Sequence, residues 1–176
     1  LFRYPPYDLA LATRMLEGRE EARVDLFHVH YAIPHAVSAF LARSMCGGCL
    51  NFVTTLHGTD ITVVGSDRAY IRPTSFAIEQ SDAVTTVSQF LADETRLVFG
   101  VHMPLHVIPN FVDVDRYVPG TTRWYDRADG ERWIVHASNF RPVKRVADVV
   151  RAFARIAHEV PARLLLVGDG PDREQI

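Results

Sequence analysis

Helix-like and strand-like stretches alternate along nearly the whole of this 176-residue chain, and the alternation limits the folds that are open to it. Apolar residues recur at helical spacing in residues 8–16, 35–45, 72–80, 89–99 and 146–158. Short apolar runs that are typical of buried strands lie at 24–29, 51–56, 82–87, 106–108, 133–137 and 163–167. Because short connections join the strands to the helices, we predict an α/β fold in which helices cover both faces of parallel sheets.

The alternation is interrupted by a polar and irregular stretch that contains Pro, Gly, Asp and Arg. Such a stretch is typical of a connection between domains. We therefore predict a first domain in residues 1–117, a linker at 118–131 and the start of a second domain at 132–176. The chain opens without Met on an aromatic, proline-rich segment and closes where a helical pattern begins, so we expect an internal fragment in which both domains are incomplete.

The composition argues against several classes of protein. Hydrophobic residues make up 48% of the chain, which is enough to form a core, and the formal net charge is −2. A general nucleic-acid binder would show a basic excess, and this sequence has no long run of one charge. No stretch reaches the roughly 18 apolar residues of a membrane span, and the first residues lack the apolar core of a secretion signal. We therefore expect a soluble cytoplasmic protein.

Polar residues follow five of the predicted strands. They lie in residues 28–31, 56–60, 108–110, 138–145 and 168–171. In parallel sheets, ligands bind beside the carboxyl ends of the strands. Because these segments lie on both sides of the linker, we predict a ligand site in a cleft between two domains.

Residues 138–145, SNFRPVKR, combine three cations with the expected start of a helix. Of the 19 basic residues in the chain, Lys144 is the single lysine. A lysine offers a compact point charge, an arginine offers a planar fork, and helix N-termini favour anions. The segment therefore suggests a polyanion site, most simply for a diphosphate, although a solvated basic turn would produce the same pattern.

Two residue pairs have the spacing of metal or redox sites. His28 and His30 alternate on a predicted strand, so both side chains face the same way, but we favour packing or polar lining of the site because no third ligand lies nearby. Cys46 and Cys49 have the spacing of a redox or zinc half-site, but the sequence has no second pair and the segment follows a helix. We therefore predict two reduced thiols in a turn and no bound metal.

Two aspartates follow predicted strands. Asp60 and Asp113 are candidates for catalytic carboxylates, but Asp is common at strand ends and turns, and we favour helix capping for both. Ser88 stands directly before the predicted helix 89–99 and Gly100 directly after it. We therefore predict an N-cap at Ser88 and the end of the helix at Gly100.

The segments 28–36 (HVHYAIPHA), 55–62 (TLHGTDIT), 108–113 (IPNFVD) and 138–145 resemble the retaining glycosyltransferases of family 4, which have two Rossmann-like parallel-sheet domains in the GT-B arrangement. The resemblance covers nearly the whole chain. The segments 28–36 and 138–145 are most similar to the enzymes that begin bacillithiol biosynthesis. The resemblance implies transfer of N-acetylglucosamine from UDP-N-acetylglucosamine to L-malate, with retention at the anomeric carbon and without a metal or other cofactor.

The resemblance also implies roles for residues on the donor side. Arg141 and Lys144 would face the diphosphate and stabilise the charge that grows on the leaving phosphate. His57 would contact the donor sugar, so these three residues are the expected catalytic group. The further donor contacts that we expect are Asn139, Arg145, Asn110 and Gly168.

On the acceptor side, Tyr31, Thr55 and Thr59 would line the site for malate. Arg72 is the candidate for binding a malate carboxylate, because a guanidinium fork matches that anion. In the family, the corresponding arginine stands a few residues later, near Ser75. The expected partners are therefore a nucleotide-sugar donor and a small dicarboxylate acceptor, with no nucleic acid and no membrane, while self-association stays open.

Two parts of the family pattern are missing from this sequence. No glycine-rich loop precedes Asp8, and no two glutamates stand eight positions apart. We therefore expect this fragment alone to be inactive. Two alternatives to malate transfer stay open: a related enzyme with a sugar phosphate or inositol phosphate acceptor, and a non-catalytic nucleotide-binding α/β module.

Overall fold

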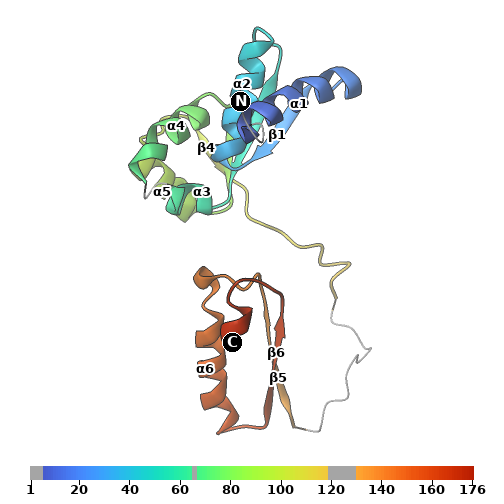
Figure 1. Cartoon of the computed structure of the whole chain (residues 1–176), viewed down its shortest axis with the longest axis vertical. Helices are drawn as coiled ribbons and strands as arrows, with labels where there is room; N and C mark the ends of the chain where they lie inside the picture. Colours follow the sequence, from blue (N-terminus) through green and yellow to red (C-terminus); the bar gives the residue numbers. More distant parts are fainter. Residues whose placement is uncertain (1–5, 65–66, 119–129) are drawn as a thin grey trace. The chain divides into compact units, whose positions relative to one another are not determined.

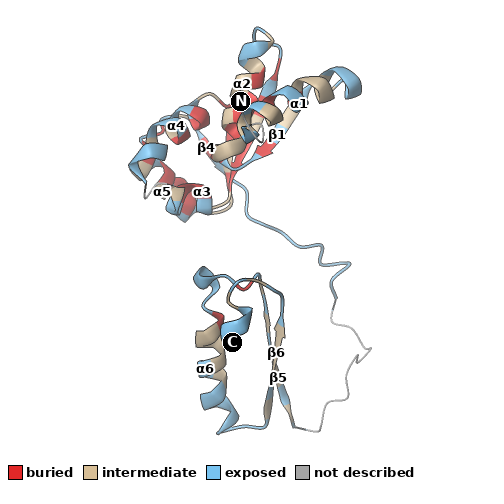
Figure 2. Cartoon of the chain, in the orientation of Figure 1, coloured by how far each residue is buried: buried red, intermediate tan, exposed pale blue. Residues whose placement is uncertain are grey.

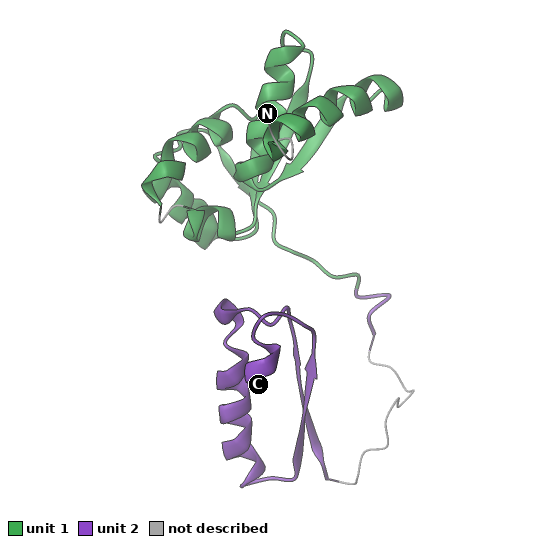
Figure 3. Cartoon of the chain, viewed as in Figure 1, with its two compact units in different colours: residues 1–113 green, residues 114–176 purple. Residues whose placement is uncertain are grey.

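The computed structural model describes residues 6–64, 67–118 and 130–176, and the chain forms two compact units (Figure 3). The first unit is Leu1–Asp113 and the second is Val114–Ile176. Each unit contains a parallel sheet with helices, so the predicted α/β class is confirmed. Most of the predicted linker, residues 119–129, lies outside the described residues. Among the described residues, no helix combines the length and the apolar character that crossing a membrane requires.

The first unit contains a four-stranded parallel sheet with the strand order β1-β2-β3-β4 (Figure 1). In chain order, its elements are α1 (Tyr7–Ala22), β1 (Leu26–His30), the π-helix η1 (Ala32–Ala36), α2 (Val37–Met45), β2 (Asn51–Leu56), α3 (Thr59–Thr62), α4 (Arg68–Glu79), β3 (Ala83–Thr86), α5 (Gln89–Phe99) and β4 (Leu105–Val107). In the register of this sheet, His30 on β1 lies beside Thr55 on β2, and Thr55 lies beside Thr85 on β3. The strand ends that carry predicted site residues are therefore neighbours.

The helices of the first unit pack against one face of the sheet. On β2, Phe52 contacts the core cluster that includes α1 and α2, and Leu56 contacts the cluster that includes α3 and α5. The opposite face of β2 carries Val53 and Thr55, which line a pocket. Among the described residues, no helix residue lines the pocket on this face, and covering of both faces stays a prediction for the complete protein. Right-handed crossovers between strands in sequential order place all connecting helices on the same side, and a second helical layer requires a reversal of strand order.

The two ends of α5 are determined by its local sequence. Ser88 is the N-cap, since its Oγ accepts a hydrogen bond from the Leu91 N–H at 3.2 Å. Gly100 adopts the left-handed conformation with φ 62°, and its N–H donates to Arg96 O at 3.0 Å. Both predicted end signals are confirmed, and α5 has the predicted bounds.

The second unit is a single βαβ unit. The strands β5 (Arg132–Ala137) and β6 (Ala162–Val167) pair in parallel, and α6 (Val146–Ala157) connects them. The short 3-10 helix η3 (Pro142–Lys144) follows β5, and η4 (Arg173–Gln175) follows β6. Figure 2 shows that burial in the described part of this unit is concentrated near the loop between β5 and α6, at Phe140 and Val146. This loop is therefore the best packed part of the unit.

Candidate active site

The carboxylate of Asp60 joins the turns that follow β1 and β2. Its Oδ1 accepts hydrogen bonds from the backbone N–H groups of His57 (3.2 Å) and Gly58 (2.9 Å), and its Oδ2 accepts one from Ala32 N–H (3.1 Å). Asp60 is 2% exposed. The predicted helix cap is therefore wrong, because this buried carboxylate satisfies three backbone amides and bridges two turns. Asp113 is followed by a turn at residues 114–116 and caps no helix there.

Positive φ angles shape both turns. Tyr31 has φ 74° and ψ 133°, and its N–H donates to Thr55 O at 2.9 Å, which extends the sheet pairing beyond β1. Gly58 has φ 120°, a conformation that residues with side chains rarely adopt. Backbone strain of the kind that Tyr31 carries concentrates at functional sites. The ring of Tyr31 lies beside that of His57, with the two centroids 5.1 Å apart.

Polar side chains form a row across the open face of the first sheet. His28 Nε2 and Thr55 Oγ1 are 2.7 Å apart, and Thr55 Oγ1 and Thr85 Oγ1 are 2.6 Å apart. His30 lies next to this row, and the ring centroids of His28 and His30 are 4.6 Å apart, so the prediction that both face the same way is confirmed. Within the part of the chain that the structure describes, no three His, Cys, Asp or Glu side chains are arranged to hold a metal.

The surroundings of His30 disfavour the charged form of its imidazole. Desolvation lowers its pKa below the ordinary value of 6.5, and the neighbouring His28, His57 and His35 lower it further. His30 Nδ1 and His57 Nε2 are 2.7 Å apart, so one nitrogen of each ring is engaged in this contact.

A pocket of about 400 Å³ lies on the open face, lined by β1, β2, β3 and the segment after β4. It brings together three predicted site residues, Thr55, His57 and Asn110. Asn110, which the resemblance assigns to the donor, therefore lies in the first unit beside Thr55, an expected acceptor contact, and His57, an expected contact of the donor sugar. Thr59, at the start of α3, and Arg72, on α4, are both exposed and do not line the pocket.

In the second unit, the loop after β6 packs closely against the loop after β5. The Phe140 N–H donates to Asp169 O at 2.9 Å. Gly168 allows this approach, because a Cβ at its position would lie 1.8 Å from Ser138 O. Gly168, a predicted donor contact, therefore positions the loop that carries four other predicted donor contacts, Asn139, Arg141, Lys144 and Arg145.

That loop carries three exposed cations before α6. Arg141 and Lys144 belong to the turn formed by η3, and Arg145 adopts the left-handed conformation with φ 50° as the N-cap of α6. Arg145 forms an ion pair with Asp148 in the first turn of α6, and hydrogen bonds from Arg151 and Arg145 hold the pKa of Asp148 below its ordinary value. Arg145 is therefore already paired, whereas Arg141 and Lys144 form no ion pair with any described residue.

The prediction of two reduced thiols is wrong, because Cys46 and Cys49 form a disulfide. The turn after α2 places their Cα atoms 5.5 Å apart, within the range that a disulfide spans. Gly47 and Gly48 permit this turn by adopting φ angles of 67° and 92°.

Parallel α/β units with polar residues at the carboxyl ends of their strands are the architecture of GT-B glycosyltransferases. The sequence pattern of Glycosyltransferase Family 4 matches residues 1–116, and the chain belongs to this family. The chain is also 49% identical, over 176 residues, to N-acetyl-alpha-D-glucosaminyl L-malate synthase of Bacillus anthracis. This match covers 98% of the chain and 46% of that protein, so the chain spans about half the length of the relative. The predicted resemblance to the family is therefore confirmed.

Proposed function

We propose that the complete protein is a retaining glycosyltransferase that transfers N-acetylglucosamine from UDP-N-acetylglucosamine to the hydroxyl of L-malate, the first step of bacillithiol synthesis. The observation that carries the proposal is the 49% identity, along 98% of this chain, to a relative named N-acetyl-alpha-D-glucosaminyl L-malate synthase. Membership of glycosyltransferase family 4 supports the same class of reaction.

On the donor side, Arg141 and Lys144 are the proposed contacts of the diphosphate. Both are exposed before the N-terminus of α6, whose backbone N–H groups add positive potential. Cleavage of the glycosidic bond leaves negative charge on the departing phosphate, and fixed cations stabilise that charge more than they stabilise the ground state. Asn139, exposed in the same loop, is a further proposed contact. Arg145 has a supporting role, because it neutralises Asp148, whose charge would otherwise repel the phosphates.

On the acceptor side, the pocket on the open face of the first sheet is the proposed malate site. Thr55 offers a hydroxyl there, and His57 and Asn110, which the resemblance assigns to the donor, offer an imidazole and an amide beside it. Malate carries two carboxylates, and removing them from water requires cations or several strong donors. The lowered pKa of His30 disfavours its charged form. Arg72 does not line this pocket, so we expect the balancing charge to come from parts of the complete protein outside this chain.

The test of this function is the release of UDP from UDP-N-acetylglucosamine by the complete protein, with and without L-malate. We expect release to depend on malate. Release that ignores malate but requires a sugar phosphate or inositol phosphate would assign a different acceptor within the family. UDP binding without any release would instead favour a non-catalytic nucleotide-binding module.

The resemblance implies a carboxylate contact at Arg72, which lies outside this pocket, and a matched pair of substitutions on α4 tests that role. Arg72 and Arg68 are both exposed on this helix. We expect Arg72→Ala to raise the KM for malate by about one to two decades through the loss of a charge-assisted hydrogen bond, with little change in the KM for the donor. Arg68→Ala should leave both values unchanged. A normal malate KM in Arg72→Ala would remove this residue from the acceptor site.

A further inference from the structure

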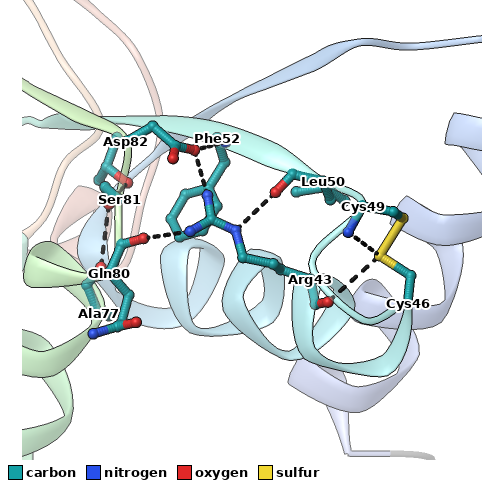
Figure 4. A network of polar contacts seen from close by, with 10 residues as sticks. Arg43, Cys46, Cys49, Leu50, Phe52, Ala77, Gln80, Ser81 and Asp82 are labelled. Carbon is teal, nitrogen blue, oxygen red and sulfur yellow. Dashed lines mark hydrogen bonds and ion pairs between the residues drawn. A yellow bond between two sulfur atoms is a disulfide. The ribbon is translucent and has the colours of Figure 1, made fainter.

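The turn that follows α2 holds a disulfide in a Cys-Gly-Gly-Cys segment, beside the polar network of Arg43 (Figure 4). A disulfide with two intervening residues closes a very short loop and therefore restricts the unfolded chain less than a longer loop would. We propose that the Cys46–Cys49 bond is a reversible exchange site for low-molecular-weight thiols and dithiols. In this exchange, Cys49 Sγ is the attacked sulfur and Cys46 Sγ is the leaving thiolate.

The two cysteines differ in their surroundings. Cys49 is exposed, whereas Cys46 is half-buried and packs against the core cluster that includes α1, α2 and β2. Thiol–disulfide exchange proceeds by direct attack of a thiolate on one sulfur, and its rate depends on access to that sulfur. The nucleophile therefore reaches Cys49, and the electron pair of the broken bond passes to Cys46.

The sulfur of Cys46 has a hydrogen-bond donor for its thiolate form and a hydrogen-bond acceptor for its thiol form. The Cys49 backbone N–H lies 3.2 Å from this sulfur as a donor, and donation to a thiolate stabilises its charge. The carbonyl oxygen of Arg43 lies 3.4 Å from the same sulfur and can accept the thiol proton once the thiolate is protonated. The surroundings therefore accommodate the reduced state as well as the disulfide.

Hydrogen bonds that involve no sulfur hold the ends of the turn. Arg43 Nε donates to Leu50 O at 2.7 Å, and its Nη1 donates to Gln80 O at 2.9 Å. From α1, Arg19 Nε donates to Cys49 O at 3.1 Å. Because none of these bonds involves a sulfur atom, we expect them to hold the two thiols close together after the disulfide opens, so that it can form again.

The exchange is balanced when a dithiol is the reductant. One thiolate of the dithiol attacks Cys49 Sγ and forms a mixed disulfide, while the bond to Cys46 breaks. The second thiolate of the dithiol then attacks the sulfur that the dithiol contributed to the mixed disulfide. Cys49 leaves as a thiolate, and the oxidised dithiol closes into a cyclic disulfide. The two protons lost by the dithiol pass to the two protein thiolates, so the protein gains two electrons and two protons.

The first test uses the unsubstituted protein under native conditions. We expect dithiothreitol to reduce the bond without denaturant and oxidised glutathione to restore it, so that the mass of the chain rises and then falls by two hydrogen atoms. Reduction that occurs only after unfolding in guanidinium would mark a structural disulfide and overturn the proposal. Thiols that stay reduced in the folded protein under excess oxidised glutathione would overturn it as well.

A matched pair of single substitutions tests which sulfur is attacked. Cys46→Ser retains the exposed thiol, and Cys49→Ser retains the half-buried one. With oxidised glutathione, we expect Cys46→Ser to form its mixed disulfide at least about tenfold faster than Cys49→Ser, because access controls the rate. Equal rates in two variants that are folded by circular dichroism would overturn the assignment of the attacked sulfur.

Discussion

Replacing Gly168 with alanine would force apart two loops of the second unit that the structure places in contact. Gly168 has φ 144°, and an added Cβ would lie 1.8 Å from the backbone oxygen of Ser138. Ordinary contacts of a Cβ begin near 3.4 Å, so one loop must move by about 1.6 Å, the difference between these distances. The loop that begins at Ser138 also carries Arg141 and Lys144, so the displacement would reach the proposed diphosphate contacts.

Two effects of Gly168→Ala set the expected magnitude. A backbone conformation that only glycine adopts readily costs another residue on the order of 1–3 kcal/mol. A misplacement of about 1 Å at a reacting site lowers the rate by about 10²-fold. We therefore expect kcat/KM for UDP-N-acetylglucosamine to fall by about two decades and the free energy of unfolding to fall by about 1–3 kcal/mol.

Steady-state kinetics and urea unfolding of the complete protein measure the two effects separately. Gly100→Ala is the matched control, because Gly100 also has a positive φ of 62° but nothing lies within 4 Å of its Cβ position. This control should lower stability and leave the donor kinetics unchanged. A wild-type kcat/KM in Gly168→Ala would refute the reasoning that contact between these loops positions the cations.

Further substitutions test individual contacts. Arg141→Ala and Lys144→Ala should each slow turnover by about one to two decades, because each removes a charge-assisted hydrogen bond worth about 1.5–3 kcal/mol. The thermal unfolding midpoint of both variants should stay unchanged. Normal kinetics in both variants would show that these residues do not bind the diphosphate. Asp60→Asn should lower the free energy of unfolding, measured in urea, by about 1–3 kcal/mol, because it removes an acceptor of buried backbone amides. The control Asp67→Asn, at an exposed N-cap, should change this free energy by at most a few tenths of a kcal/mol. The pKa of His30 is lower in the folded chain than in the unfolded chain, so the unfolded chain takes up the proton first as the pH falls. The contribution of His30 to stability is therefore complete above pH 6.5 and is lost below it. His30→Gln should flatten this part of the pH profile of urea unfolding, and an unchanged slope would contradict the assignment.

Local signals in the sequence predict some element ends and miss others. The sequence predicts α5 and β2 with the bounds that the structure shows, and for α5 the reason is that side chains at both ends select the boundary. The helix α1 continues to Ala22, beyond the predicted end at residue 16, because residues 17–22 are mostly charged helix formers without an apolar stripe. The four-residue α3 and three-residue η3 are too short to show a period, so spacing alone does not predict them.

The candidate site is only partly predictable from the sequence. The sequence shows where strands end, but it often does not show which residues the side chains at those ends contact. Thr55 lies near the end of a buried run and His57 follows it, and parallel strands bring such positions to one edge of a sheet. The contact between Thr55 and Thr85 depends on the register of two strands, which the sequence does not display. The pairing of Arg145 with Asp148 could have been predicted from their spacing, because oppositely charged residues three positions apart meet on a helix. The Cys-x-x-Cys spacing is common to reduced, metal-bound and disulfide-bonded pairs, and so does not distinguish them.

The one-sided sheet divides the positions of β2 into two sets that natural variation can change separately. Phe52, Thr54 and Leu56 are buried beneath the helices, and Val53 and Thr55 face the pocket. Side chains alternate between the two faces of a strand, so a substitution at 53 or 55 would reshape the pocket while the hydrophobic core keeps its packing. Changing every second residue of this strand would therefore alter the lining of the pocket without altering the core.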